Sequence, residues 1–148
     1  MLGLLIGGAV FVALYVTVCG MLAAGDWWRL QTTYAAASVP VAAATRLVAA
    51  RVGRTFYQLV RVGADGEALY LSSPPLLLFH GPIRVPWQVI TCVSEDIGIS
   101  GTLVLSVPCK GDDVGIVVYG NGASWLRASV PLPLSRRTPP DTIRSLDK

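Results

Sequence analysis

The sequence is poor in the residues on which enzyme chemistry usually depends. It contains one histidine, His80, which excludes a metal site with two histidine ligands and the H-E-x-x-H motif. Cys92 and Cys109 do not have C-x-x-C spacing, and neither G-x-x-x-x-G-K-[ST] nor G-x-G-x-x-G occurs. Adjacent residues of a strand point to opposite faces, which separates Glu95 from Asp96, and the pair Asp112-Asp113 lies in a predicted turn. We therefore expect a protein that is not an enzyme and that holds neither a cofactor nor a metal.

His80 itself has two interpretations. It could act as a base beside Ser72 or Ser73, which precede it in the sequence. A histidine in a turn more often forms a hydrogen bond with the backbone, and we expect that structural role here.

Charged residues are scarce as well. They make up 14% of the chain, and the net charge is +3. Proteins that bind nucleic acids usually cluster Lys and Arg, and no such cluster occurs, so we expect no nucleic-acid partner. A mildly basic surface instead suits the acidic cytoplasmic leaflet of a membrane.

The longest run without any charge covers residues 2–24. As an α-helix these residues would be roughly 34 Å long, enough to cross a hydrocarbon core of about 30 Å. A cleaved signal sequence is the alternative, with Ala23 and Gly25 as small residues near a cleavage site. Signal sequences, however, usually begin with Lys or Arg and have a shorter apolar core. We predict an uncleaved, single-pass transmembrane helix.

The basic residues near this helix predict its orientation. Only the α-amino group precedes it, whereas Arg29 follows it closely. The positive-inside rule then places the N-terminus outside and the remaining chain in the cytoplasm. Cys19 lies in the helix, and in a cytoplasmic domain we expect Cys92 and Cys109 to be buried thiols. A domain on the outer side would favour a disulfide between them.

Residues 25–45 are predicted to form an interfacial segment and a linker. Trp27, Trp28 and Tyr34 mark the membrane border, because aromatic side chains with a polar tip prefer the headgroup region. Trp27, Leu30 and Tyr34 have i, i+3, i+7 spacing and therefore share one face of a short helix. The Ala-rich residues 35–45 lack a clear period and form the linker.

Residues 46–130 are predicted to form one small β-rich domain. The segments predict six or seven short strands, with a proline break at residues 74–75 and turns at residues 63–66, 80–81 and 110–113. The strand segments are 54–62, 67–72, 76–79, 83–93, 102–108 and 114–119. Their spacing predicts an antiparallel sandwich or a partly open barrel. Residues 123–129 follow as one short helix with Trp125 and Leu126 turned inward, and residues 131–148 form a Pro-rich, poorly structured tail.

One face of the predicted transmembrane helix is suited to packing against another helix. Small residues let helices approach closely and recur here at i+3 or i+4. The residues of this predicted interface are Gly3, Gly7, Ala9, Ala13, Thr17 and Gly20, together with Tyr15. Tyr15 belongs to it because its hydroxyl needs a partner in the bilayer. The alternative is that Gly and Ala are simply frequent in membrane helices.

Two blocks of residues resemble known families. Leu69-Tyr70-Leu71-Ser72 and the segment from Leu78 to Trp87 resemble the GLYL…HPPLxIPW pattern of an uncharacterised family of small bacterial membrane-anchored proteins, although Gly81 replaces the first proline. The resemblance implies a bacterial inner membrane. More distantly, the order of turns and strands is similar to PH-like and GRAM domains. That similarity implies a bent seven-stranded sheet closed by a C-terminal helix.

Two functions follow from these observations. The first is a non-catalytic, membrane-anchored accessory or scaffolding subunit, which docks on other membrane-protein subunits through its helix and its β-domain. The second is a PH-like module at the membrane surface that binds anionic lipid headgroups or a peptide. The predicted headgroup contacts are Arg46, Arg51, Arg54 and Arg61. Because residues 63–67, in the turn after the first predicted strand, contain only acidic charges, we favour the subunit.

Overall fold

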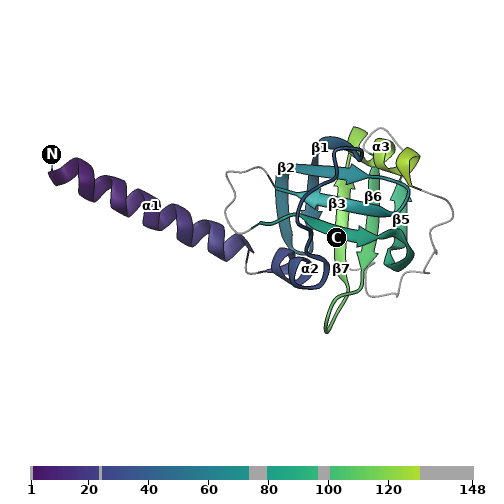
Figure 1. The fold of residues 1–148 in the computed structure, drawn as a ribbon, viewed down its shortest axis with the longest axis horizontal. Coiled ribbons are helices and arrows are strands. Elements are labelled where there is room, and N and C mark those ends of the chain that lie inside the picture. Colours follow the sequence, from purple (N-terminus) through teal and green to yellow (C-terminus); the bar gives the residue numbers. More distant parts are fainter. Residues whose placement is uncertain (1, 24, 74–79, 97–100, 131–148) are drawn as a thin grey trace.

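The computed structural model describes residues 2–23, 25–73, 80–96 and 101–130. Two helices precede seven strands, and one helix follows them (Figure 1). In chain order, the helices and strands are α1 (Leu2–Ala23), α2 (Asp26–Tyr34), β1 (Ala44–Val52), β2 (Thr55–Ala64), β3 (Ala68–Ser72), β4 (Ile83–Pro86), β5 (Thr91–Asp96), β6 (Thr102–Val107), β7 (Val114–Tyr119) and α3 (Asn121–Ser129). The predicted antiparallel β-domain and its short C-terminal helix are confirmed.

All seven strands belong to one antiparallel sheet with the order β4-β3-β2-β1-β7-β6-β5. The sheet curls into a half-barrel, which decides between the two predicted architectures in favour of a partly open barrel (Figure 1). Strand β1 joins the two halves, because it pairs with β2 along its length and with β7 at Ala50–Val52. Its register with β2 shifts between Val48 and Ala50, just where the pairing with β7 begins. A bulge bends a strand, so this shift lets one strand serve both halves of the sheet.

The core follows from the alternation of side chains along the strands. In β6, Leu103, Leu105 and Val107 are buried, and the residues between them are half-buried. Helix α3 covers one end of this core with Leu126, which is fully buried, while Trp125 packs at its border. The inward orientation predicted for both residues is therefore confirmed, and most of the interior is aliphatic.

Several predicted boundaries differ from the structure. Strand β1 begins at Ala44, inside the predicted linker, and it was not predicted as a strand of its own. Apolar and polar residues do not alternate clearly in its sequence, ATRLVAARV. Pairing with β2 on one side and β7 on the other holds it in the sheet. Gly53 and Arg54 form the β1–β2 turn, although Arg54 was assigned to a strand. Residues 87–89 form a 3-10 turn that interrupts the strand predicted over 83–93. The predicted strand 76–79 and the tail 131–148 lie outside the described residues.

Helix α2 is part of the hydrophobic core. Trp27, Leu30 and Tyr34 do share one face, as their spacing predicts, but this face packs on the β-domain. Trp27 is 1% exposed and Leu30 is fully buried, whereas the neighbouring Trp28 is 52% exposed. The prediction that Trp27 lies at the membrane border is therefore corrected. An amphipathic period shows which residues face an apolar environment, and here that environment is protein.

The two adjacent tryptophans provide a direct test of this arrangement. We expect Trp27→Ala to lower the free energy of unfolding by about 3–5 kcal/mol, because it empties a large buried volume. Trp28→Ala, the matched control, should change it by no more than about 0.5 kcal/mol. Urea unfolding of the full chain in mild detergent, followed by circular dichroism, measures both. Equal effects of the two substitutions would contradict the burial of Trp27.

Candidate functional site: the apolar helix and its junction with the β-domain

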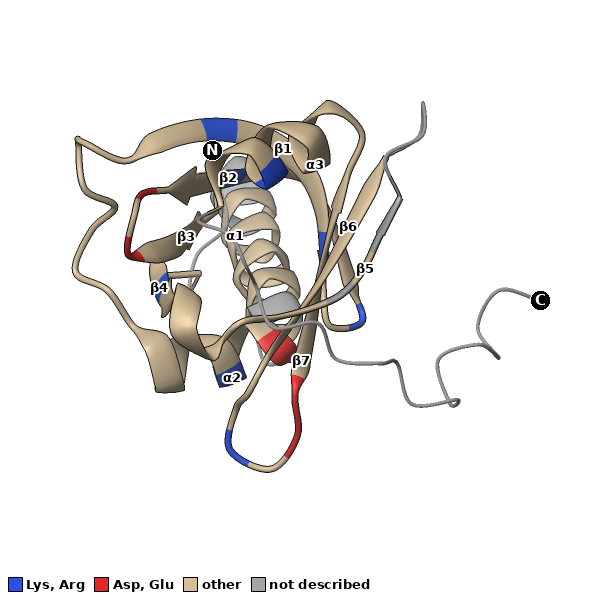
Figure 2. Cartoon of the chain, turned by 90° about the vertical axis from the view of Figure 1, so that its right-hand side faces the viewer, with Lys and Arg blue, Asp and Glu red and all other residues tan. Residues whose placement is uncertain are grey.

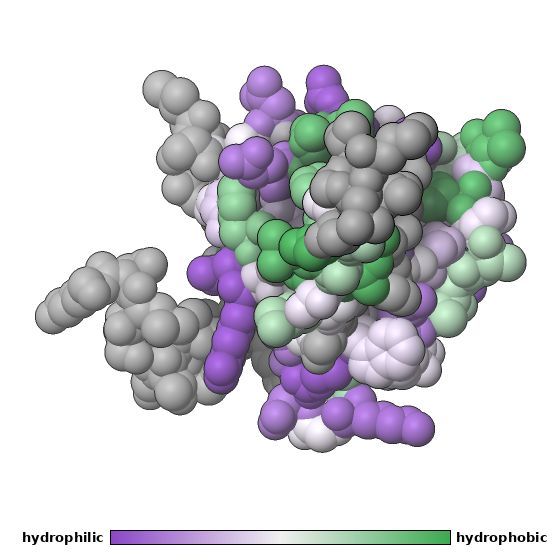
Figure 3. All heavy atoms as spheres, turned by 90° about the vertical axis from the view of Figure 1, so that its left-hand side faces the viewer, coloured by the Kyte–Doolittle hydropathy of each residue, from purple (hydrophilic) through white to green (hydrophobic). Residues whose placement is uncertain are grey.

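Helix α1 projects from the domain and exposes apolar side chains around its circumference. Phe11 is 69% exposed, and Val10, Val12, Leu14 and Met21 are exposed as well. Viewed from the side on which α1 projects, hydrophobic residues gather in the middle of the face, with hydrophilic residues above and below them (Figure 3). A helix that is apolar all round normally lies inside a protein or a membrane. In the chain by itself, the outer surface of α1 is therefore not covered by the protein or lipid that normally surrounds such a helix.

The residues of the predicted helix-packing interface lie on this exposed helix. Gly7, Ala9, Ala13 and Thr17 are exposed and Gly20 is half-buried. Nothing lies within 4 Å of a Cβ atom placed on Gly7 or Gly20, so the small side chains leave open space. Gly3 belongs to α1, but its surroundings are outside the described part of the chain.

The two hydroxyl groups of α1 find partners within the helix. The Thr17 hydroxyl donates a hydrogen bond to the Ala13 carbonyl at 2.8 Å. The Tyr15 hydroxyl interacts with the Cys19 side chain, one turn further along. The prediction used Tyr15 as a sign that another protein must supply its partner. Because the helix supplies one, that argument for a helical partner no longer holds.

A membrane span is not established by helix length and composition. Among the described residues, no single helix meets the length and hydropathy expected of a span. Residues Gly7–Met21 of α1 and Asp26–Tyr34 of α2 together have the length and hydropathy of a span, although the two helices make a bend of 71° with each other. The core helix of a soluble protein or a signal sequence can have the same length and composition.

Polar contacts fix the start of α2 to two turns of the sheet. One carboxylate oxygen of Asp26 accepts a hydrogen bond from the backbone N–H of Arg54, in the β1–β2 turn, at 3.1 Å. The other pairs with Arg29 at 3.2 Å. The guanidinium of Arg29 also donates to the carbonyl of Asp112, in the β6–β7 loop, at 2.8 Å. The two charged residues of α2 therefore connect the helix to the β-domain.

The end of α2 is attached in the same way. The Tyr34 hydroxyl donates a hydrogen bond to the Pro108 carbonyl at 2.7 Å. The Gln31 side chain accepts one from the backbone N–H of Gly81 at 3.1 Å, and the N–H of Ala36 donates to the Pro82 carbonyl at 3.0 Å. Tyr34, predicted at the membrane border, thus contacts the loop after β6. Helix α2 is attached to the domain at both ends.

The buried centre of this junction contains the single histidine. The Trp27 ring lies 5.3 Å from the Tyr57 ring and 5.1 Å from the His80 ring, measured between centroids. The Tyr57 hydroxyl and His80 Nε2 are 3.2 Å apart, and the Trp27 indole N–H donates to the Gly81 carbonyl. Burial raises the pKa of Tyr57 to about 12. His80 therefore lies in an aromatic cluster, which is consistent with the structural role expected of it.

The four arginines of the predicted headgroup contacts do not form one site. Arg46, Arg51 and Arg61 are exposed on β1 and β2, and Arg54 lies in the turn that contacts α2. Arg61 is directly opposite Leu47, and Arg51 is opposite Phe56. Basic residues lie on β1, β2 and β4 but also on α2 and in the β6–β7 loop, whereas acidic residues lie at the β2–β3 turn, at the start of α2 and in the β6–β7 loop (Figure 2). The arginines are thus dispersed over a strand surface that also carries apolar side chains.

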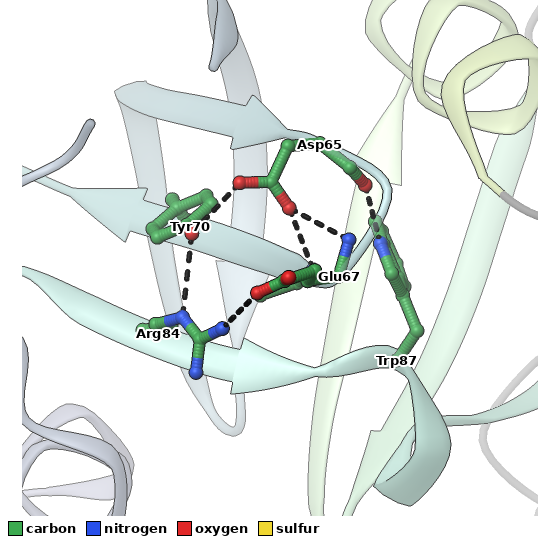
Figure 4. Close-up of polar contacts among 6 residues, drawn as sticks. Asp65, Glu67, Tyr70, Arg84 and Trp87 are labelled. Carbon is green, nitrogen blue, oxygen red and sulfur yellow. Dashed lines mark hydrogen bonds and ion pairs between the residues drawn. The ribbon is translucent and has the colours of Figure 1, made fainter. Parts of the chain in front are cut away.

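A separate polar cluster holds the β2–β3 turn (Figure 4). The Asp65 carboxylate accepts hydrogen bonds from the N–H groups of Glu67 and Ala68 and from the Tyr70 hydroxyl, each at 2.8 Å. The Trp87 indole N–H donates to the Asp65 carbonyl at 2.7 Å, and Arg84 contacts Tyr70 and Glu67. Burial alone would raise the pKa of Asp65, but these hydrogen bonds and Arg84 lower it overall. The contacts within the cluster explain a stable turn.

The remaining candidate groups lie on different elements of the described chain. Within the described ranges, no three His, Cys, Asp or Glu side chains lie together as metal ligands would. Cys92 is buried, and Cys109 is half-buried in the loop after β6. Asp112 and Asp113 lie in an exposed loop, where Asp113 accepts a hydrogen bond from Ser106. The side chains of Glu95 and Asp96 are outside the described part.

Comparison with known proteins finds no matching family model, no matching curated protein and no matching solved structure. The geometry of α1, of its junction and of the strand surface therefore carries the functional interpretation.

Two glycines with positive φ test the contact between α2 and the β1–β2 turn. A methyl group on Gly53 would collide with the Asp26 side chain, whereas the space around Gly111 is open. We expect Gly111→Ala to lower the free energy of unfolding by about 1–2 kcal/mol, because alanine rarely adopts the positive φ of this position. Gly53→Ala should cost at least about 1 kcal/mol more because of the collision. Equal shifts of the urea midpoint would show that α2 does not rest on this turn.

The Asp65 cluster predicts a dependence of stability on pH. The folded-state pKa lies below the ordinary value near 4, so the carboxylate stabilises the fold above that value and the effect is lost as the pH falls through the lowered pKa. We expect Asp65→Ala to lower the free energy of unfolding by about 1–2 kcal/mol at pH 7. The loss should become progressively smaller as the pH is lowered. Asp112→Ala, at an exposed side chain, serves as the control. A cost of Asp65→Ala that did not change between pH 7 and pH 3 would contradict this role.

Proposed function

We propose that the protein is a single-pass, membrane-anchored and non-catalytic accessory subunit, whose α1 lies in the inner membrane and whose β-domain docks on a larger assembly. The observation that carries the proposal is the apolar, outward-facing circumference of α1 beside a well-packed domain. In water this surface would be an aggregation hazard. A bilayer or a helical partner provides the surroundings that it lacks.

The apolar composition of α1 supports a membrane location. By itself the described helix does not meet the length and hydropathy expected of a span, and its 22 residues rise about 33 Å as one helix. No charged side chain interrupts the helix, and Asp26 and Arg29 follow directly after it. Because Trp27 and Leu30 are buried in the β-domain, α2 is not available to extend the span. The orientation with the N-terminus outside and the domain in the cytoplasm remains part of the proposal.

The junction supports docking rather than simple tethering. A tether needs only a flexible linker, but α2 is attached at both ends to the loops of the sheet. A fixed α2 gives α1 a defined point of attachment on the domain. Such an attachment is useful when a second protein must contact both the helix and the domain.

A pocket for one lipid headgroup, the alternative function, has less support. Recognition of a phosphate group needs basic side chains that converge on it. The four candidate arginines are dispersed along two strands and a turn, and the backbone of that turn is bonded to α2. The arrangement favours a subunit over a headgroup receptor.

Mild-detergent purification of the full chain through a C-terminal tag tests the proposal. We expect the protein to resist a carbonate wash of the membranes and then to co-purify with a stoichiometric set of membrane proteins. Ala13→Leu with Thr17→Leu fills the open face of α1 and should reduce that recovery at least fivefold. Val12→Leu with Val16→Leu enlarges two positions that are already large, and it serves as the control for added apolar volume on another face of α1. Recovery of the protein alone would refute the subunit role.

A further inference from the structure

The outward surface of the β1–β2 hairpin combines exposed apolar and basic side chains. We call Leu47, Arg51, Phe56, Leu59 and Arg61 the hairpin face. Its three apolar members are 55–56% exposed. Leu47 is directly opposite Arg61, and Arg51 is directly opposite Phe56, so an apolar and a basic side chain stand side by side twice. The centroid of the Phe56 ring also lies 5.8 Å from that of the Tyr119 ring. This contact extends the surface onto β7.

The charge on this hairpin has one sign. Residues 44–64 contain four arginines and no Asp or Glu. Arginine can pack its aliphatic stem beside leucine and phenylalanine while its guanidinium reaches outward to phosphate groups. Surfaces that rest on anionic bilayers combine the same two properties, apolar area and positive charge. The composition of the hairpin face therefore fits a layer of acidic headgroups.

The position of the hairpin points to the same surface. Helix α1 projects from the side of the half-barrel on which β2 lies (Figure 1). In the view from the opposite side, α1 lies behind the half-barrel and overlaps its middle (Figure 2). If α1 enters a bilayer, the strands next to it are brought close to that bilayer. Charge, exposure and position thus agree.

We infer that the hairpin face rests on the anionic leaflet of the membrane that holds α1. This inference depends on the proposed anchoring, and it names the surface on which the domain lies. The contact is broad and does not select one headgroup, which accords with the dispersed arginines. Attraction to acidic lipids of about 1 kcal/mol for each arginine corresponds to about a fivefold effect per residue on the docked population. Leu47, Phe56 and Leu59 add apolar contact.

Site-specific photo-crosslinking of the full chain in nanodiscs tests the contact. A benzophenone amino acid replaces Leu59, and mass spectrometry identifies its adducts in discs of phosphatidylcholine with and without 30% phosphatidylglycerol. The same group at Ser124, on the exposed side of α3, is the control on the domain. We expect lipid adducts at position 59 to exceed those at position 124 at least fivefold in the anionic discs. Arg51→Gln with Arg61→Gln should reduce this excess at least fivefold.

A third position separates this inference from the anchoring proposal. Benzophenone at Leu14 reports whether α1 is in the bilayer. Lipid adducts at position 14 but not at position 59 would refute the hairpin contact alone. Absence of adducts at position 14 would refute the anchor as well. Crosslinks from position 59 to a protein in native membranes, without lipid adducts in anionic discs, would show that a protein covers the face and would overturn the inference.

Discussion

The burial of Trp27 and Leu30 beneath the loops of the sheet determines how the rest of the molecule is arranged. These two side chains turn α2 from a connecting segment into a part of the core, next to Tyr57 and His80. Asp26, Arg29, Gln31 and Tyr34 then connect the helix to three different loops. Helix α1 ends at Ala23 and α2 begins at Asp26, with a bend of 71° between the two helices, so the apolar segment meets the domain at the start of α2.

A fixed attachment has a consequence for function. The β1–β2 hairpin lies on the side of the domain from which α1 projects, and it carries the exposed arginines and three exposed apolar side chains. The surface of the domain that a membrane would meet is therefore defined by the fold. In the proposed subunit, this leaves the remaining surface of the domain and part of α1 for protein contacts.

The sequence predicted the strand-rich part of the fold well where turns and alternation are clear. The β2–β3 and β6–β7 hairpins have glycine and aspartate in their turns, and both are present. Strand β1 could not be recognised, because its Ala-rich sequence is stabilised by partners on both sides. The location of Trp27 was wrong for a different reason. An aromatic amphipathic helix after an apolar run has the same pattern whether it faces lipid or a protein core, and only tertiary packing distinguishes them. The hairpin face was predicted only in part: its arginines were named as candidate contacts, but the sequence does not show that Leu47, Phe56 and Leu59 are exposed beside them.

The most direct measurement of the central claim is the distance distribution between α1 and the β-domain in a bilayer. Spin-labelled non-natural amino acids at positions 12 and 124 of the full chain in nanodiscs allow it to be measured by double electron–electron resonance. The account predicts one narrow distribution, which broadens when Trp27→Ala releases α2 from the core. A distribution that is broad in the unaltered chain would show that the domain is only loosely tethered, and it would contradict the account.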